Sequence, residues 1–303
     1  MSDSMAACVC ADGLTRRFGS TLALDGLSFT MAQGQIIGLL GRNGAGKSTL
    51  LRILSGQLRQ SEGKIELFGM PVFNNAAALG ELCMIGDTPD FGRLSNRKAF
   101  FRACASLFSG WDMALAQKLA DRFELPEKKP LKGFSRGMQT ALLLCVGLAS
   151  KAKLTVFDEP SLGLDAVMRE RFYDLLLEMR SEQPERTFII STHLIDEVAR
   201  TLDYAVLMDH GRLLCEGELK TLMSSYLSVS GAPDAVRAAT EGAQVLREEE
   251  VAGSLVRHLR LNEPADRERL LNHEGVQGAP IHLQRLFVFL TDEEEGERHA
   301  NDA

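Results

Sequence analysis

A glycine-rich segment near the start of the chain combines residue types that bind phosphate. It reads Gly41-Arg42-Asn43-Gly44-Ala45-Gly46-Lys47-Ser48-Thr49, between an apolar strand expected at Gln35–Leu40 and a helix expected at Thr49–Leu58. Glycines let backbone N–H groups approach a phosphate, and a helix start favours an anion. The Lys47 charge suits the β- and γ-phosphates of ATP, and the Ser48 hydroxyl suits Mg²⁺. We expect these residues to contact the nucleotide: Gly41, Asn43, Gly44, Ala45, Gly46, Lys47, Ser48 and Thr49.

Two carboxylates follow a second apolar strand, which is expected at Leu154–Phe157. Asp158 is placed to hold Mg²⁺ directly or through water. Glu159 is then free to orient and deprotonate an attacking water molecule. A carboxylate pair after a strand is by itself more typical of a solvated loop. Its occurrence together with the phosphate-binding segment favours the catalytic interpretation.

Three further signals are weaker when taken singly. Ser135 and Gly137 open a helical stretch, which is typical either of an anion site or of an ordinary helix cap. Asp165 follows the carboxylate pair within Ser161-Leu162-Gly163-Leu164-Asp165, and His193 ends a strand expected at Thr187–Ser191. A lone histidine is more often structural than catalytic, so the order of all five elements carries the interpretation.

In this order the elements resemble the nucleotide-binding domain of the ATP-binding cassette (ABC) family, over about Cys8 to Tyr226. The resemblance implies that two such domains meet head to tail, with each ATP between the phosphate-binding loop of one and the signature motif of the other. It implies that Ser135 and Gly137 bind the partner's γ-phosphate and that Asp165 belongs to the interface loop. It also implies that His193 contacts the γ-phosphate and the attacking water.

The resemblance extends to an aromatic position and includes two departures. Phe18, 29 residues before Lys47, matches the residue that stacks on adenine, although a strand core residue is an equally good interpretation without the family. The signature reads FSRGMQ rather than LSGGQ, with Arg136 in place of a glycine. Where the family usually has a Gln that touches Mg²⁺, the best candidate is Asp87. We hypothesise that Asp87 reaches Mg²⁺, and the alternative is a loop aspartate that faces water.

The expected fold class is α/β, a P-loop NTPase of ABC type. Strands expected at Leu154–Phe157, Thr187–Ser191 and Tyr204–Met208 alternate with helical patterns, which predicts a RecA-like core with a parallel sheet. Short apolar stretches over Cys8–Met31 predict an N-terminal antiparallel β-subdomain. The middle of the chain has helical spacing and predicts a helical lobe.

The same patterns predict the division of the chain. We expect the nucleotide-binding domain over residues 1–226, with the helical lobe at about 91–151. A small α+β accessory region is expected over 227–291. An acidic tail without regular structure is expected over 292–303.

Composition limits the class of protein. The 303 residues carry a formal net charge of −7, which argues against a broad nucleic-acid surface. No apolar stretch approaches the ~20 residues that a membrane-spanning helix needs, and no secretory signal is visible. The six cysteines are scattered and are expected to be reduced thiols.

We therefore expect an ATP-hydrolysing subunit of a membrane transporter that works on the cytoplasmic face of the membrane. Its partners would be a second nucleotide-binding domain, identical or paralogous, and a separate permease docked on the lobe near Phe91–Phe108. The aromatic residues there fit the lobe core equally well. The alternatives are a soluble ABC ATPase of translation or chromosome maintenance and an ABC ATPase with a regulatory output. The sequence does not indicate the transported substrate.

Overall fold

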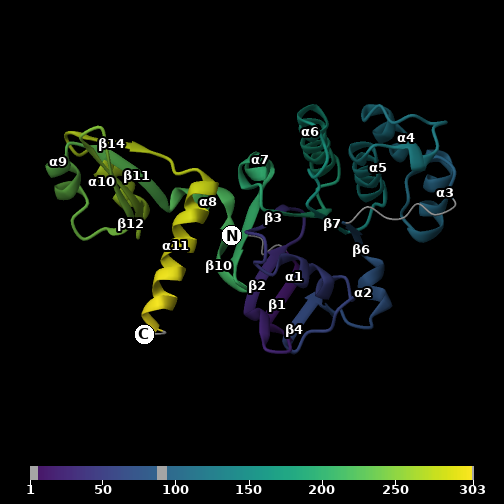
Figure 1. The fold of residues 1–303 in the computed structure, drawn as a ribbon, viewed down its shortest axis with the longest axis horizontal. Coiled ribbons are helices and arrows are strands. Elements are labelled where there is room, and N and C mark those ends of the chain that lie inside the picture. Colours follow the sequence, from purple (N-terminus) through teal and green to yellow (C-terminus); the bar gives the residue numbers. More distant parts are fainter. Residues whose placement is uncertain (1–5, 87–93, 302–303) are drawn as a thin grey trace.

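The computed structural model describes residues 6–86 and 94–301, and its centre is a six-stranded sheet (Figure 1). The strand order is β10-β9-β3-β8-β7-β6, and every pairing is parallel except the antiparallel β9–β10 hairpin. The strands of this sheet are β3 (Ile36–Gly41), β6 (Leu82–Ile85), β7 (Leu154–Asp158), β8 (Thr187–Thr192), β9 (Tyr204–Asp209) and β10 (Arg212–Glu218). The predicted parallel sheet is confirmed.

Continuous apolar runs form the middle strands because both faces of the sheet are covered. Every residue of β3 and of β8 is buried. Alternate side chains enter different cores: Ile36 and Leu40 face one core, whereas Ile37 and Leu39 face the other. The sheet is therefore a rigid platform whose ends can hold side chains in fixed positions.

Helices and short helical turns connect these strands and cover the sheet. They are α1 (Lys47–Leu54), α2 (Ala76–Gly80), α3 (Arg97–Leu107), α4 (Met113–Arg122), η1 (Leu131–Gly133), α5 (Arg136–Ala149), α6 (Ala166–Glu182), α7 (Ile195–Val198), η2 (Ala199–Thr201) and α8 (Leu219–Ser224). Helix α1 is shorter than the sequence pattern predicts. It begins at Lys47 and ends at Leu54, since Gly56 follows in a left-handed conformation.

The N-terminal strands form a second sheet beside α1. Its strand order is β2-β1-β4-β5, and its three strand pairings are antiparallel, as predicted for this part of the chain. The strands are β1 (Ala7–Phe18), β2 (Thr21–Ala32), β4 (Glu62–Leu67) and β5 (Met70–Pro71).

Helices α3, α4 and α5 build the helical lobe on the other side of the central sheet (Figure 1). Side chains cap the starts of these helices: Asn96 accepts from Ala99 N, and Asp112 accepts from Leu115 N. Phe101 is buried and its ring packs against Trp111, with centroids 5.7 Å apart. The aromatic residues of this segment thus contribute to the lobe core.

The C-terminal region is a βαββαβ unit. Its four-stranded sheet has the order β12-β13-β11-β14, with antiparallel neighbours. The elements are β11 (Tyr226–Gly231), α9 (Pro233–Ala239), β12 (Gln244–Val251), β13 (Ser254–Arg260), α10 (Pro264–Leu271) and β14 (Val276–Ala279). This arrangement is consistent with the α+β character expected there.

A final helix, α11 (Leu283–Asn301), joins this unit to the part of the chain built around the six-stranded sheet (Figure 1). The Phe289 ring lies 4.5 Å from the buried His258 ring of β13, while Leu286 and Leu290 pack in the same core as α7 residues. The helix continues to Asn301, so the expectation of a tail without regular structure over 292–303 is wrong for 292–301. Glutamate has a high helix propensity, and the acidic run extends a helix that tertiary packing has already started.

Membrane spans and cysteines can be assessed over the same residues. Among residues 6–86 and 94–301, no helix has both the length and the apolar character needed to cross a bilayer. All six cysteines are free, and four of them are buried, as expected.

The contacts of Arg186 with α5 and β7 allow a test of the packing of the central sheet. The buried Arg186 guanidinium donates to the carbonyls of Gly147 (3.2 Å) and Leu148 (2.8 Å) at the end of α5, and to Thr155 Oγ1 (3.1 Å) in β7. Gly147 O keeps a second donor in Ser150 Oγ at 2.8 Å. Arg186→Met still removes the charged donor to Leu148 O and Thr155 Oγ1, and it should lower the free energy of unfolding by about 3 kcal/mol in urea denaturation. Arg122→Met, which removes a half-exposed ion pair with Glu178, should cost less than about 1 kcal/mol. Equal losses in the two variants would contradict this account.

Candidate functional site

The ends of three adjacent parallel strands form the site. Strand β3 runs into the glycine-rich loop, β7 ends at Asp158, and β8 lies between them and ends at Thr192. The register pairs Leu40 with Thr192, and Asp158 with Ser191. Because carboxyl ends of parallel strands share one edge, residues far apart in sequence meet there.

The glycine-rich loop needs glycine for two physical reasons. Gly44 and Gly46 have φ values of +87° and +99°, which side chains disfavour. At Gly41 and Gly46 a Cβ atom would also lie 2.4 Å from Met208 O and 2.7 Å from Ala23 O. The loop wraps a cavity of about 450 Å³ at the start of α1. That cavity is lined by Thr21, Leu22, Ala23, Arg42, Asn43, Gly44, Ala45, Gly46, Lys47, Ser48, Thr49, Glu159 and His210.

Lys47 points back into its own loop. Its side chain is buried, and Nζ donates to Gly41 O at 2.7 Å and to Arg42 O at 3.2 Å. Burial lowers the pKa of Lys47, and the charges of Glu159 and Asp158 oppose that effect. The ammonium is thus held at the cavity wall by acceptors that a phosphate oxygen can replace.

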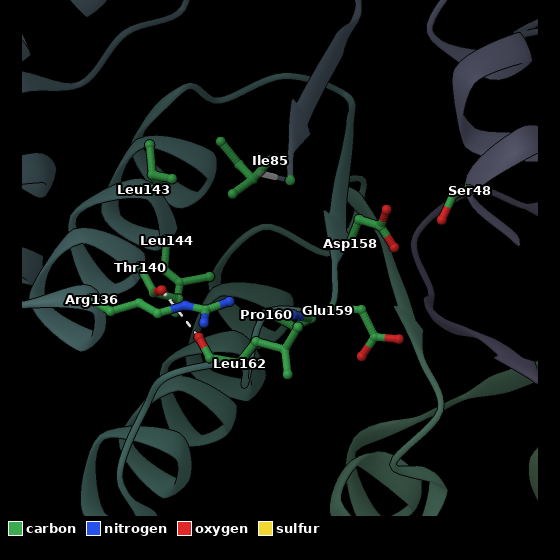
Figure 2. A pocket seen from close by; sticks show the side chains of 11 residues that line it. Ser48, Ile85, Arg136, Thr140, Leu143, Leu144, Asp158, Glu159, Pro160 and Leu162 are labelled. Atoms are coloured by element: carbon green, nitrogen blue, oxygen red, sulfur yellow. Dashed lines mark hydrogen bonds between the residues drawn. The ribbon is translucent and has the colours of Figure 1, made fainter. Parts of the chain in front are cut away.

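Asp158, Glu159 and Ser48 line a neighbouring cavity of about 220 Å³ (Figure 2). Figure 2 shows Ser48 of α1 on one side of the two carboxylates and Arg136 of α5 on the opposite side. Asp158 Oδ1 accepts a hydrogen bond from Ser191 Oγ at 2.7 Å. Carboxylate and hydroxyl oxygens are the ligands that Mg²⁺ prefers, so Asp158 and Ser48 fit this ion.

Glu159 is fixed by its neighbours on β8. Its backbone N donates to Ser191 O at 2.8 Å, and its φ of +49° is unusual for a residue with a side chain. Thr192 Oγ1 donates to Glu159 Oε2 at 3.0 Å, and His193 Nδ1 lies 2.9 Å from Glu159 Oε1. An ionised carboxylate only accepts, so Nδ1 of His193 carries the proton in this contact. Each carboxylate oxygen keeps one lone pair for a further donor.

Of the signature residues, Arg136 lines the smaller cavity, whereas Ser135 and Gly137 on either side of it line neither cavity. Ser135 caps α5, where its Oγ accepts from Met138 N at 3.3 Å. A Cβ on Gly137 would lie 2.6 Å from Gly163 O, so glycine lets the start of α5 pack against the loop before Asp165. Asp165 caps α6 by accepting from Met168 N at 2.8 Å. Neither Ser135 nor Gly137 lines a cavity with the glycine-rich loop of the same chain.

Two further candidates are Phe18, which lies outside the larger cavity, and Asp87. Phe18 is the last residue of β1 and is 45% exposed. The Arg16 guanidinium lies over its ring, 4.5 Å from the ring centroid. Phe18 does not line the 450 Å³ cavity. Asp87, the candidate for a further Mg²⁺ contact, lies outside the described residues.

Three residues to which the sequence patterns assign no role lie at the site in the folded chain. Ser191 and Thr192 hold the two carboxylates, and His210 lines the larger cavity. The hydroxyl pair directly before His193 was the available signal. His210 had none, because its place depends on the β9–β10 turn, where Gly211 N donates to Ala45 O at 3.0 Å.

Comparison with known proteins identifies the family. The ABC transporter family profile matches residues 24–162. A Nod factor export ATP-binding protein I of Burkholderia lata is 30% identical over 295 residues, which cover 92% of this chain and 95% of that protein. The daunorubicin resistance ATP-binding protein DrrA3 of Streptomyces coeruleorubidus is 32% identical over 218 residues, 69% of this chain and 67% of that protein. The chain belongs to the ABC transporter family, as an ATP-binding subunit.

Solved structures support the same fold. An ATP-binding subunit of an ABC transporter matches with a TM-score of 0.64 and 22% identity, covering 71% of this chain and 91% of that one. The cbiO1 protein of Clostridium perfringens, part of the ABC transporter complex cbiONQ, matches with a TM-score of 0.61 and 23% identity, covering 78% and 96%. The expected α/β fold of ABC type is confirmed.

Two glycines of the loop provide a matched test of its geometry. Both have positive φ, but a Cβ on Gly44 has no neighbour within 4 Å, whereas one on Gly46 collides with Ala23 O. Gly44→Ala should weaken ATP binding by about fivefold from backbone strain of about 1 kcal/mol. Gly46→Ala should weaken it at least about 100-fold, because the clash forces the loop to move. Equilibrium dialysis with labelled ATP measures both, and a smaller effect at Gly46 than at Gly44 would contradict this geometry.

Proposed function

We propose that this chain hydrolyses ATP to power a membrane transporter, working as a head-to-tail dimer docked on a separate permease at the cytoplasmic face of the membrane. The observation that carries the proposal is the position of Glu159. Its carboxylate is fixed between Thr192 and His193 and lines the cavities of both Lys47 and Asp158. A base beside the phosphate site is what hydrolysis requires.

In the proposed reaction, Glu159 accepts a proton from the water that attacks the γ-phosphorus, and the bond to ADP breaks. The lone pairs left on its carboxylate suit this role. Lys47 binds the β- and γ-phosphates, and backbone N–H groups at Gly44 to Thr49 cradle them. His193 is proposed to orient Glu159 through Nδ1 and to contact the water and the γ-phosphate through its other ring nitrogen.

Asp158 and Ser48 would hold Mg²⁺, with Asp87 as a further proposed contact. Bound Mg²⁺ would neutralise negative charge on the phosphate oxygens. The Ser191 hydroxyl orients Asp158 for this role through its 2.7 Å hydrogen bond. Phe18 is proposed to stack on adenine, since its exposed ring ends the strand beside the loop cavity.

A second copy of the chain, or a paralogue, is proposed to complete the site. Ser135 and Gly137 do not share a cavity with their own glycine-rich loop. They open α5 and pack against the loop that ends at Asp165, so these two segments form one surface. This surface suits the γ-phosphate of a nucleotide held by a partner.

The base assignment is testable by Glu159→Gln, which keeps the size and the hydrogen-bonding capacity of the side chain. This variant should bind ATP and accumulate as a dimer in gel filtration, while kcat falls at least about 100-fold. Glu170→Gln, on the exposed side of α6, is the matched control and should keep a normal rate. A Glu159→Gln variant with a normal rate would show that Glu159 is not the base.

Coupling to a permease is a separate prediction. The resemblance to export and drug-resistance subunits supports a transport role. From cells that express it with a neighbouring permease gene, the chain should co-purify with membranes only when that permease is present. Permease-independent ATPase activity that ribosomes or DNA stimulate would instead support the soluble alternative.

A further inference from the structure

We propose that Arg169 and Glu197 form a positioning pair that holds His193 against Glu159. Arg169 lies in the first turn of α6, and Glu197 lies in α7, four residues after His193. The two side chains form an ion pair between Arg169 Nη1 and Glu197 Oε1. The inference rests on the hydrolysis proposed above and adds two residues that line neither cavity of the site.

The pair joins two functional segments of the chain. Asp165 caps α6 and its carbonyl accepts from Arg169 N at 3.0 Å, so Arg169 is one turn from the loop proposed to face the partner. On the other side, α7 begins directly after His193 and Leu194. Leu194 N donates to Thr192 Oγ1 at 3.1 Å, and that hydroxyl donates to Glu159. A shift of α7 therefore moves both donors to the Glu159 carboxylate.

The surroundings make the pair sensitive to loss of one partner. The side chains are only 29% and 25% exposed. Arg169 Nε and Glu197 Oε2 are buried and have no hydrogen-bond partner in the described part of the chain. Tyr173, one turn further along α6, is buried, and burial together with the charge of Glu197 raises its pKa to about 12. Removing one charge would leave the other desolvated beside this phenol, which favours movement of the short helix α7.

A second ion pair offers a control in the same place. Glu170 and Arg200 join α6 to η2, which directly follows α7. Their side chains are 60% and 52% exposed, so solvent screens the pair. The two pairs connect the same parts of the fold and differ in burial and in distance along the chain from His193.

The experiment measures ATPase kcat and KM, the Kd for ATP and the melting temperature of the full chain. Arg169→Met and Glu197→Gln should each lower kcat by about 10- to 100-fold, since small displacements of an orienting group have effects of this size. The Kd for ATP should change by less than about twofold, because neither residue lines the nucleotide cavity. Arg169→Lys should retain most of the rate, and Arg200→Met and Glu170→Gln should leave it unchanged within about twofold.

A double variant separates positioning from stability. Arg169→Met combined with Glu197→Gln removes both charges and should restore the melting temperature, since no unpaired charge remains buried. Positioning predicts that its kcat stays low. Full recovery of kcat in the double variant would overturn the proposal, as would normal kcat in both single variants or an equal loss in Arg200→Met. If Glu159→Gln is inactive while the pair variants have a normal kcat, only the positioning role of Arg169 and Glu197 is rejected. If Glu159→Gln has a normal kcat, the assignment of Glu159 as the base is rejected, and the positioning role that rests on it is rejected as well.

Discussion

The parallel register of β3, β8 and β7 is the constraint on which the rest of the site depends. It pairs Leu40 with Thr192 and Asp158 with Ser191, so the glycine-rich loop, the carboxylates and His193 leave the sheet at one edge. The burial of every residue of β3 and β8 fixes that register, because a slip by one residue would exchange side chains between two differently packed cores. Chemistry at the edge is thus positioned by the packing of the sheet.

At the same edge of the sheet, hydrogen bonds hold the charged side chains of Glu159 and Lys47 in fixed positions. Glu159 has a left-handed backbone, and hydrogen bonds from Thr192 and the ring of His193 orient its carboxylate. Lys47 bonds to carbonyls of its own loop, which keeps a buried cation paired. Both arrangements cost free energy locally, and the surrounding strands supply the stability that maintains them.

Much of this could be predicted from local sequence. The glycine-rich loop, the strand before Asp158 and the helical lobe follow from spacing and apolar pattern, because each signal lies within a short segment. The roles of Ser191 and of His210 could not, because they depend on contacts between strands and on a turn that only the folded chain brings to the loop. The continuation of α11 was missed because an acidic run alone indicates a solvated tail, whereas packing of Leu286 and Phe289 starts a helix that the glutamates extend.

A composite site between two chains is the central claim, and mixing two inactive variants tests it most directly. Lys47→Ala removes the phosphate-binding charge and keeps the signature surface, whereas Ser135→Phe blocks the signature surface and keeps Lys47. In a head-to-tail pair one site then combines the intact loop of one chain with the intact signature of the other. We predict that ATPase activity returns on mixing and rises with the fraction of mixed dimers. No recovery at any mixing ratio, with both variants folded and forming mixed dimers, would contradict the account.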